Sequence, residues 1–288
     1  MKKPLVIAIL FIAVSCLPAA CSPGSQPLNS TPTETPLPVS TAVPTTASRA
    51  SNVEVLYYDI SGFLVRVGDK KILIDTLFDS YPGHSPPQEA FEMMLKGEPP
   101  FDQVDVVLTT HAHPDHFSAA VMSEFLLNNP ETVLVSTFQV VEELVEESPD
   151  LLNSIYSVDI QRGESEVISL DGIEIECLYI SHGDPNLLNL GFIVRVDQVT
   201  FFHSGDIVLE DVSVDELVAY GLPELDLDFA LVVFHVLKYE QYHQHLTEGI
   251  QAKYVIPTHY QYDNPLNPYE AFPDAVLFSD TMQTWQMP

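Results

Sequence analysis

Three histidines and one aspartate lie within six residues of the sequence, as His111, His113, Asp115 and His116. In an extended backbone, residues two apart point the same way, so His111 and His113 can present ring nitrogens to one cation. Pro114 suits the start of a helix, and the two residues after it leave the turn toward a second cation. Neutral imidazole with carboxylate suits zinc, manganese or iron. The alternative is a histidine-rich surface loop; we favour a metal site.

The motif is expected on a turn between a strand and a helix. Residues 104–108 form a mostly apolar run that predicts a buried strand, and residues 117–127 have the apolar spacing of a helix. Four further polar residues each follow the apolar run of another predicted strand: Asp75, His182, Asp206 and His259. Strand ends on one rim of an α/β protein can gather ligands from distant parts of the chain.

The rest of the pattern predicts hairpin clusters with helices between them. Predicted strands cover residues 53–58, 62–67, 71–75, 132–136, 166–170, 173–180, 191–196, 199–203, 229–234 and, as the last clear strand, 254–256. Asp171-Gly172 is a strong hairpin turn. Predicted helices cover residues 88–96, 138–147, 215–220 and 239–251. Two similar halves of this kind predict an α/β sandwich of two mixed sheets with helices outside.

Composition limits the classes of partner. The 288 residues are 46% hydrophobic, enough for the core of one large domain or two small ones. The formal net charge is −30, which opposes binding to nucleic-acid phosphates and to a bulk anionic membrane surface. There is no Gly-rich nucleotide loop and no GxSxG nucleophile motif. The expected partner is therefore a small-molecule or lipid-derived substrate.

The N-terminal stretch is typical of an export signal. Lys2 and Lys3 precede an apolar run over residues 4–17 that is too short to span a membrane. Cys21 follows it and resembles the lipidated cysteine of bacterial lipoproteins, with Cys16 as the alternative. Residues 22–52, rich in Pro, Thr and Ser, predict a disordered tether. We expect a signal at 1–21, a tether at 22–52 and a folded domain at 53–288, exported and lipid-anchored at the outer face of the bacterial cytoplasmic membrane or cell envelope.

The order of the polar residues resembles the signature of the metallo-β-lactamase-fold hydrolase superfamily. Its five parts are a strand ending in Asp75, the HxHxDH motif, His182, Asp206 and His259, so the resemblance spans most of the expected domain. It implies a four-layer αβ/βα sandwich of two mixed β-sheets flanked by helices. It also implies two divalent cations, zinc by preference with manganese or iron as alternatives. The ligands that it implies are His111, His113 and His182 for the first metal, Asp115, His116 and His259 for the second, and Asp206 as the bridge. Asp75 would steady the motif turn from behind.

The resemblance implies a hydrolytic enzyme. Two metals can activate a shared hydroxide and polarise an ester-type bond, here a phosphodiester or a lactone, and Asp115 could orient that hydroxide. The segments 189–192, 203–206 and 256–260 are similar to those of the branch with ascorbate-phosphate lactonase and N-acyl phosphatidylethanolamine phospholipase D. A lipoprotein that binds a metal or ligand on this scaffold without catalysis is the alternative. A redox role for two irons is the third choice.

Other residues have weaker patterns. His235 ends the predicted strand 229–234 on the same rim, so it is a candidate for substrate contact or for a catalytic proton donor. His203 is expected as a packed neighbour of the site, and His243 and His245 as surface residues. His84 lies in a Pro-rich loop that could line the pocket. Cys177 alternates with isoleucines, which predicts a core thiol without a chemical role.

Overall fold

The computed structural model describes residues 52–82, 86–259 and 270–288. The predicted signal, the tether as far as residue 51 and His84 fall outside these ranges and remain predictions. Within the ranges, no helix is both long and apolar enough to cross a membrane.

The first sheet begins with two antiparallel hairpins and continues with parallel strands. Its strand order is β13-β1-β2-β3-β4-β5-β6. The bounds are β1 Val53–Asp59, β2 Gly62–Val67, β3 Lys70–Ile74, β4 Val106–Thr109, β5 Val133–Thr137, β6 Ile155–Val158 and β13 Thr284–Gln286. From β3 to β6 the strands pair in parallel, with a helix before β4, β5 and β6: α1 Gln88–Lys96, α2 Ala119–Asn128 and α3 Phe138–Glu147.

The second sheet has the order β12-β11-β10-β9-β8-β7. The bounds are β7 Ser165–Leu170, β8 Ile173–Tyr179, β9 Leu190–Val196, β10 Val199–His203, β11 Phe229–Val233 and β12 Tyr254–Thr258. Asp171-Gly172 joins β7 to β8 in an antiparallel hairpin, as predicted. Strands β10, β11 and β12 are parallel, so their carboxyl ends reach the same edge.

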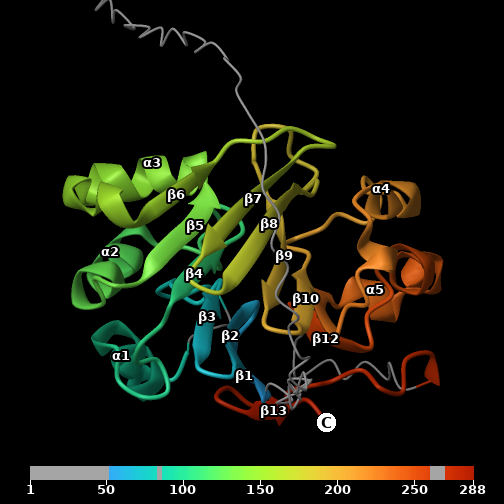
Figure 1. The fold of residues 1–288 in the computed structure, drawn as a ribbon, viewed down its shortest axis with the longest axis horizontal. Coiled ribbons are helices and arrows are strands. Elements are labelled where there is room, and N and C mark those ends of the chain that lie inside the picture. Colours follow the sequence, from blue (N-terminus) through green and yellow to red (C-terminus); the bar gives the residue numbers. More distant parts are fainter. Residues whose placement is uncertain (1–51, 83–85, 260–269) are drawn as a thin grey trace, which may run out of the picture. The chain divides into compact units, whose positions relative to one another are not determined.

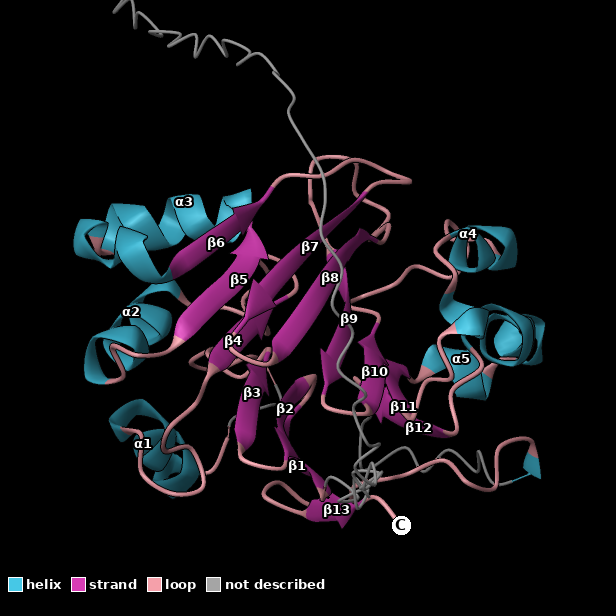
Figure 2. Cartoon of the chain, viewed as in Figure 1, coloured by secondary structure: helices cyan, strands magenta, loops and turns pink. Residues whose placement is uncertain are grey.

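Successive side chains of a strand point to opposite faces of its sheet, so the apolar residues of one strand pack in two different layers. In β1, Val55 packs between the sheets, whereas Leu56 packs against the helices of the first sheet. Helices α1, α2 and α3 cover the outer face of the first sheet; α4 (Val214–Ala219) and α5 (His235–Lys238) lie beside the second (Figure 1; Figure 2). The predicted four-layer sandwich of two mixed sheets is confirmed.

Two local predictions are wrong. In place of one helix over residues 239–251, the structure has a 3-10 turn at Glu240–Tyr242 and a π-helix at His245–Ile250. Pro114 does not start a helix: α2 begins at Ala119, where the side chain of Ser118 accepts a hydrogen bond from the Val121 amide. The first amides of a helix have no partner within the helix, and the Ser118 side chain accepts a hydrogen bond from one of them. Pro114 has a backbone angle suited to a helix, but its side chain cannot accept such a hydrogen bond.

Strands β6 and β13 were not predicted. Two of the four residues of β6 are exposed, and β13 has three residues, so neither has an apolar pattern of its own. Each forms at the edge of the first sheet because a neighbouring strand offers unpaired backbone groups.

Cys177 lies on β8 within the apolar layer between the sheets. Burial raises the pKa of its thiol to about 12, with the negative charges of Glu166 and Glu176 adding to the effect. A thiol with so high a pKa is not a nucleophile at neutral pH. This location agrees with the predicted core role.

Candidate metal centre

Seven polar residues from four loops meet at one end of the sandwich. Each loop follows the carboxyl end of a strand: the motif loop follows β4, and the others follow β8, β10 and β12. The seven are His111, His113, Asp115, His116, His182, Asp206 and His259. They form three groups whose nitrogen and carboxylate oxygen atoms lie within 4.8 Å of one another. The groups are His111, His113 and His182; His111, His116 and Asp206; and Asp115, His116 and His259. The structure therefore brings together every residue that the sequence suggested as a ligand.

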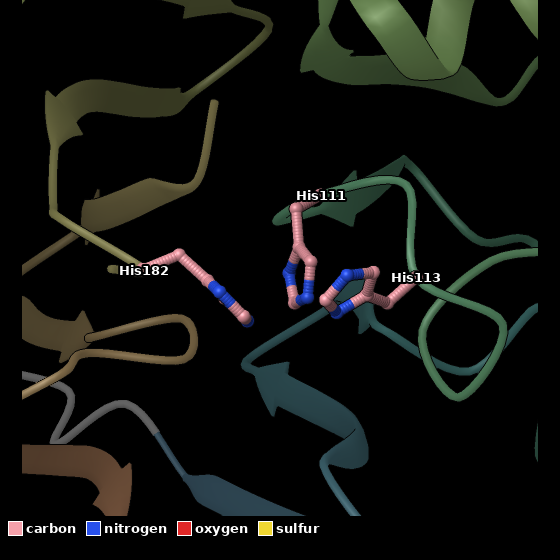
Figure 3. A group of neighbouring side chains, drawn as sticks. All are labelled: His111, His113 and His182. Atoms are coloured by element: carbon pink, nitrogen blue, oxygen red, sulfur yellow. The ribbon is translucent and has the colours of Figure 1, made fainter. Parts of the chain in front are cut away.

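The first group is a triangle of imidazoles. The ring centroids of His111, His113 and His182 are 4.6 to 4.8 Å apart, and Figure 3 shows the three rings turned toward a common point. His111 and His113 come from the motif loop, whereas His182 reaches them from the second sheet. As expected, the two motif histidines face the same point.

Asp206 lies between the two ligand sets. Its Oδ1 is 2.8 Å from His259 Nε2, and its Oδ2 is 3.3 Å from His116 Nε2. The same Oδ2 is 3.9 Å from His182 Nε2 and 4.0 Å from His111 Nε2. One carboxylate thus faces histidines of both sets, which is the arrangement that a bridging ligand requires.

Asp75 supports the site from beneath. It follows β3 and is fully buried, and its Oδ1 accepts a hydrogen bond of 2.8 Å from the Thr110 amide. Its Oδ2 accepts from the Thr110 hydroxyl at 2.8 Å and lies 2.8 Å from His116 Nδ1. Because a carboxylate only accepts, His116 donates from Nδ1, and this fixes the ring with Nε2 facing the site.

Thr110 extends this effect to a second histidine. Its hydroxyl hydrogen is committed to Asp75, so its oxygen accepts from His111 Nδ1, which is 2.9 Å away. The Nε2 of His111 then also faces the site as a free acceptor. A role for Thr110 was not predicted, because a threonine next to a motif gives no signal in the sequence.

Asn189 fixes the loop that carries Asp206. Its side-chain oxygen accepts a 3.1 Å hydrogen bond from the Asp206 amide, and its Nδ2 donates to the Ile180 carbonyl at 3.1 Å. Gly205 makes this possible: it has a φ of +54°, and an added Cβ would lie 2.4 Å from the Asn189 side chain. The similarity noted at residues 189–192 and 203–206 thus reflects one contact in space.

Three residues at the site have a strained backbone conformation. Ile60, Asp75 and His259 have φ values of 44°, 48° and 54°, in the left-handed region that non-glycine residues rarely adopt. The His259 amide donates to the Ile60 carbonyl at 3.0 Å, which holds two of the strained residues together. Strain of this kind persists where the surroundings over-determine the conformation and is common at functional sites.

Three of the candidate ligands, His111, His182 and Asp206, are in the protonation state that binds cations. Burial lowers the pKa of His111 and of His182, which keeps both rings neutral. Burial would raise the pKa of Asp206, but His116 and His259 together hold it well below its usual range. His116 differs: burial opposes its charge, yet Asp206 and Asp75 raise its pKa well above the usual value. A cation bound at Nε2 would take the place of that proton.

The donor set fits metal ions. His111 Nε2 and Asp206 Oδ1 are buried without a hydrogen-bond partner, the latter despite its proximity to His259. His116 Nε2 and His259 Nε2 lie 3.3 Å apart, each aimed at the same space. Buried polar atoms without partners are costly, and nitrogens and oxygens that converge in this way suit a zinc-type cation.

A cavity of about 490 Å³ opens onto these residues. Its lining includes Asp115, His182, Asp206, His235 and His259. Asp115 is nearly buried, whereas His235, the first residue of α5, is exposed at the rim. The expectation that His235 shares the rim of the site therefore agrees with the structure.

The remaining histidines pack away from the candidate ligands. His203 is buried, and its Nδ1 accepts from the Gly205 amide at 2.9 Å, so it is a packed neighbour as expected. The surface prediction for His245 is wrong, because its side chain is buried and its Nε2 donates to the Val212 carbonyl at 2.8 Å. His243 is half-buried against Phe272. The break in the expected helix turns both rings inward.

Comparison with known proteins agrees with this site. A family model described as the Beta-lactamase superfamily domain matches residues 54–259. A metal-dependent hydrolase from Thermococcus onnurineus is 26% identical over 67% of this chain and 79% of its own. Another metal-dependent hydrolase, from Salinibacter ruber, is 26% identical over 77% of this chain and 92% of its own. A solved metallo hydrolase from Ignicoccus hospitalis is similar in fold, with a TM-score of 0.59, 18% identity, and coverage of 83% of this chain and 99% of that one.

Asp75→Asn tests how far the outer carboxylate controls the site. Asparagine keeps the shape but places an amide NH₂ against two donors, Thr110 Oγ1 and His116 Nδ1. We expect the folded variant to bind zinc about 10–100-fold more weakly, as measured by competition with a chelator. Asp69→Asn, in an exposed turn, is the matched control and should bind zinc like the wild type. Equal affinity in folded Asp75→Asn would show that the carboxylate does not orient the ligands.

Proposed function

The chain belongs to the beta-lactamase superfamily and is a metal-dependent hydrolase, and we propose that it uses two divalent cations to hydrolyse an ester-type bond. The observation that carries the two-metal proposal is the position of Asp206 between two sets of three ligands. Zinc suits the imidazole-rich set best, and manganese or iron also fit nitrogen and carboxylate ligands.

The proposed substrate is a small molecule or a lipid-derived molecule with a phosphodiester or lactone bond. A cavity of about 490 Å³ has the size of a small-molecule site. The net charge of −30 supports the exclusion of nucleic acid, because backbone binding requires clustered basic residues. Two cations against the two carboxylates Asp115 and Asp206 leave a local excess of positive charge, which favours an anionic or strongly polarised scissile group.

When bound, the two cations supply Lewis acidity that lowers the pKa of water and polarises the scissile group. The chain's own residues determine where this acidity acts. Asp75 and Thr110 fix the rings of His116 and His111 with the lone pair of Nε2 inward. Asn189 holds the Asp206 amide, so the backbone that carries the central carboxylate is fixed before the reaction.

Two residues at the cavity wall have proposed proton-transfer roles. Asp115 lies next to His116 and His259, where its carboxylate can orient the attacking water and accept its hydrogen bond. His235 stands at the rim, where partial desolvation of its ring and the positive charge of Lys238 lower its pKa. The lowered pKa makes the protonated ring a stronger acid, which suits a group that gives a proton to a leaving group and regains it from solvent.

We also propose that the chain is exported and lipid-anchored through Cys21. The support is the order of basic residues, apolar run, cysteine and polar tether in the sequence. The Cys21→Ser variant should leave the membrane fraction or remain unprocessed, as measured by cell fractionation and the mass of the mature chain. If Cys21→Ser stays in the membrane fraction and Cys16→Ser leaves it, the anchor is Cys16.

Asp206→Asn tests the proposed reaction. The amide keeps the shape but removes the charge shared by both ligand sets, so we expect kcat to fall by several orders of magnitude. Wild type and variant are assayed on a panel of phosphodiesters and lactones, with the metal content of each measured. Cys177→Ala is the control: it should keep full activity and cost about 1 kcal/mol of stability from lost packing. Full activity in metal-replete Asp206→Asn would contradict the proposal, and an inactive wild type across the panel would reject the ester-type bond.

The same assay tests His235. If this ring protonates the leaving group, His235→Ala should lower kcat about 10²–10⁴-fold, and the loss should shrink for substrates with good leaving groups. A loss that is independent of leaving-group pKa would limit His235 to substrate contact.

A further inference from the structure

A second cavity, of about 500 Å³, adjoins the one at the metal centre. The two cavities share Ile207, Val208 and His235 in their walls, so they are parts of one cleft. The far part is lined by Leu209, Glu210, Tyr239 and Tyr242. A ligand bound at the metal centre could therefore extend past His235 into the second cavity.

The walls of the second cavity combine apolar and aromatic side chains with the polar groups of Glu210 and Gln241, and the loop after Asp206 that forms one wall is fixed. Ile207, Leu209 and Tyr242 are buried side chains. The Val208 amide donates to the Ser181 carbonyl at 3.0 Å, and the Val212 amide donates to the Val208 carbonyl at 3.1 Å. The buried His245 donates to the Val212 carbonyl from the other side. The loop after Asp206 is thus held at both ends, as a preformed binding wall requires.

Glu210 places a negative charge in this cavity. The Tyr242 hydroxyl donates a short hydrogen bond to Glu210 Oε1, which fixes the carboxylate and lowers its pKa. Glu210 is exposed, and within the described ranges it has no ion-pair partner at 4 Å or less among the basic side chains. Its carboxylate is therefore accessible to a cationic group of a ligand.

The side chain of Lys238, on α5, is directed at two aromatic rings. The Lys238 ammonium lies 5.5 Å from the ring centroid of Phe234 and 5.3 Å from that of Tyr239. The aromatic surface beside the cavity thus already binds an ammonium group, while Glu210 remains without one. Aromatic faces with a carboxylate form the usual environment for alkylammonium ligands.

The character of the cleft changes along its length. It is positively charged at the metal-loaded centre, apolar at Ile207 and Leu209, and negatively charged at Glu210. We propose that the second cavity binds the cationic end of the substrate, which would be an ester with an aliphatic chain that ends in an ammonium group. This inference rests on the proposed hydrolase function, because the metal centre anchors the other end. It makes Glu210 a residue that determines specificity.

Two series of compounds test the proposal by binding alone. One series is the ω-aminoalkyl phosphates of increasing chain length, and the other is the alkyl phosphates of matched length, which lack the charge. Both are titrated by calorimetry into the metal-loaded full chain, with inorganic phosphate as the reference. We expect the amine to improve affinity about tenfold at the chain length that spans the cleft, as for one charge-assisted contact near solvent.

The variants assign this gain to one carboxylate. Glu210→Gln should abolish the advantage of the amine, and Glu240→Gln, an exposed neighbour outside the cavity lining, should retain it. An amine without advantage at any length, or an advantage that persists in Glu210→Gln, would overturn the inference while phosphate binding still supports the proposed function. If neither series nor inorganic phosphate binds, the phosphodiester form of the proposed function fails and the inference fails with it.

Discussion

The buried carboxylate of Asp75 is the interaction on which the site depends. It places a negative charge at the end of β3, where three hydrogen bonds from the Thr110 amide, the Thr110 hydroxyl and His116 Nδ1 compensate for the lost hydration. A buried charge without such partners would cost several kcal/mol. The motif loop therefore folds against Asp75 in one arrangement, and that arrangement directs His111 and His116 toward the shared space.

Sheet topology explains why ligands distant in sequence meet. In each sheet one block of neighbouring strands is parallel, β3 to β6 in the first and β10 to β12 in the second. Strand β4 therefore ends at the rim of one sheet, and β10 and β12 end at the rim of the other. The packed apolar layer between the sheets keeps the two rims together. Hydrophobic burial thus supplies the stability of the domain. The site residues are confined to the loops at one end, and the stability of the packed layers offsets the free-energy cost of their strain and desolvation.

Local patterns in the sequence indicated the sandwich and the polar residues at strand ends, and the family resemblance assigned those residues to two metals. An apolar run followed by a histidine or an aspartate identifies a strand end, and alternation identified most strands, including the buried side of Cys177. Contacts that form only in three dimensions were not predicted. The fit of Asn189 against Gly205, the hydroxyl of Thr110 between two ligands and the buried ring of His245 have no periodic signal. The expected helix over 239–251 was wrong because apolar spacing does not distinguish a continuous helix from 3-10 and π segments packed around the same core.

The central claim is that one carboxylate, Asp206, joins two metal sites. Anomalous diffraction from crystals of the metal-loaded chain tests it most directly. We expect two peaks about 3.5–4 Å apart, one against His111, His113 and His182 and the other against Asp115, His116 and His259, with Asp206 in contact with both. A single peak at metal saturation, or two peaks of which one lies away from Asp206, would contradict the account.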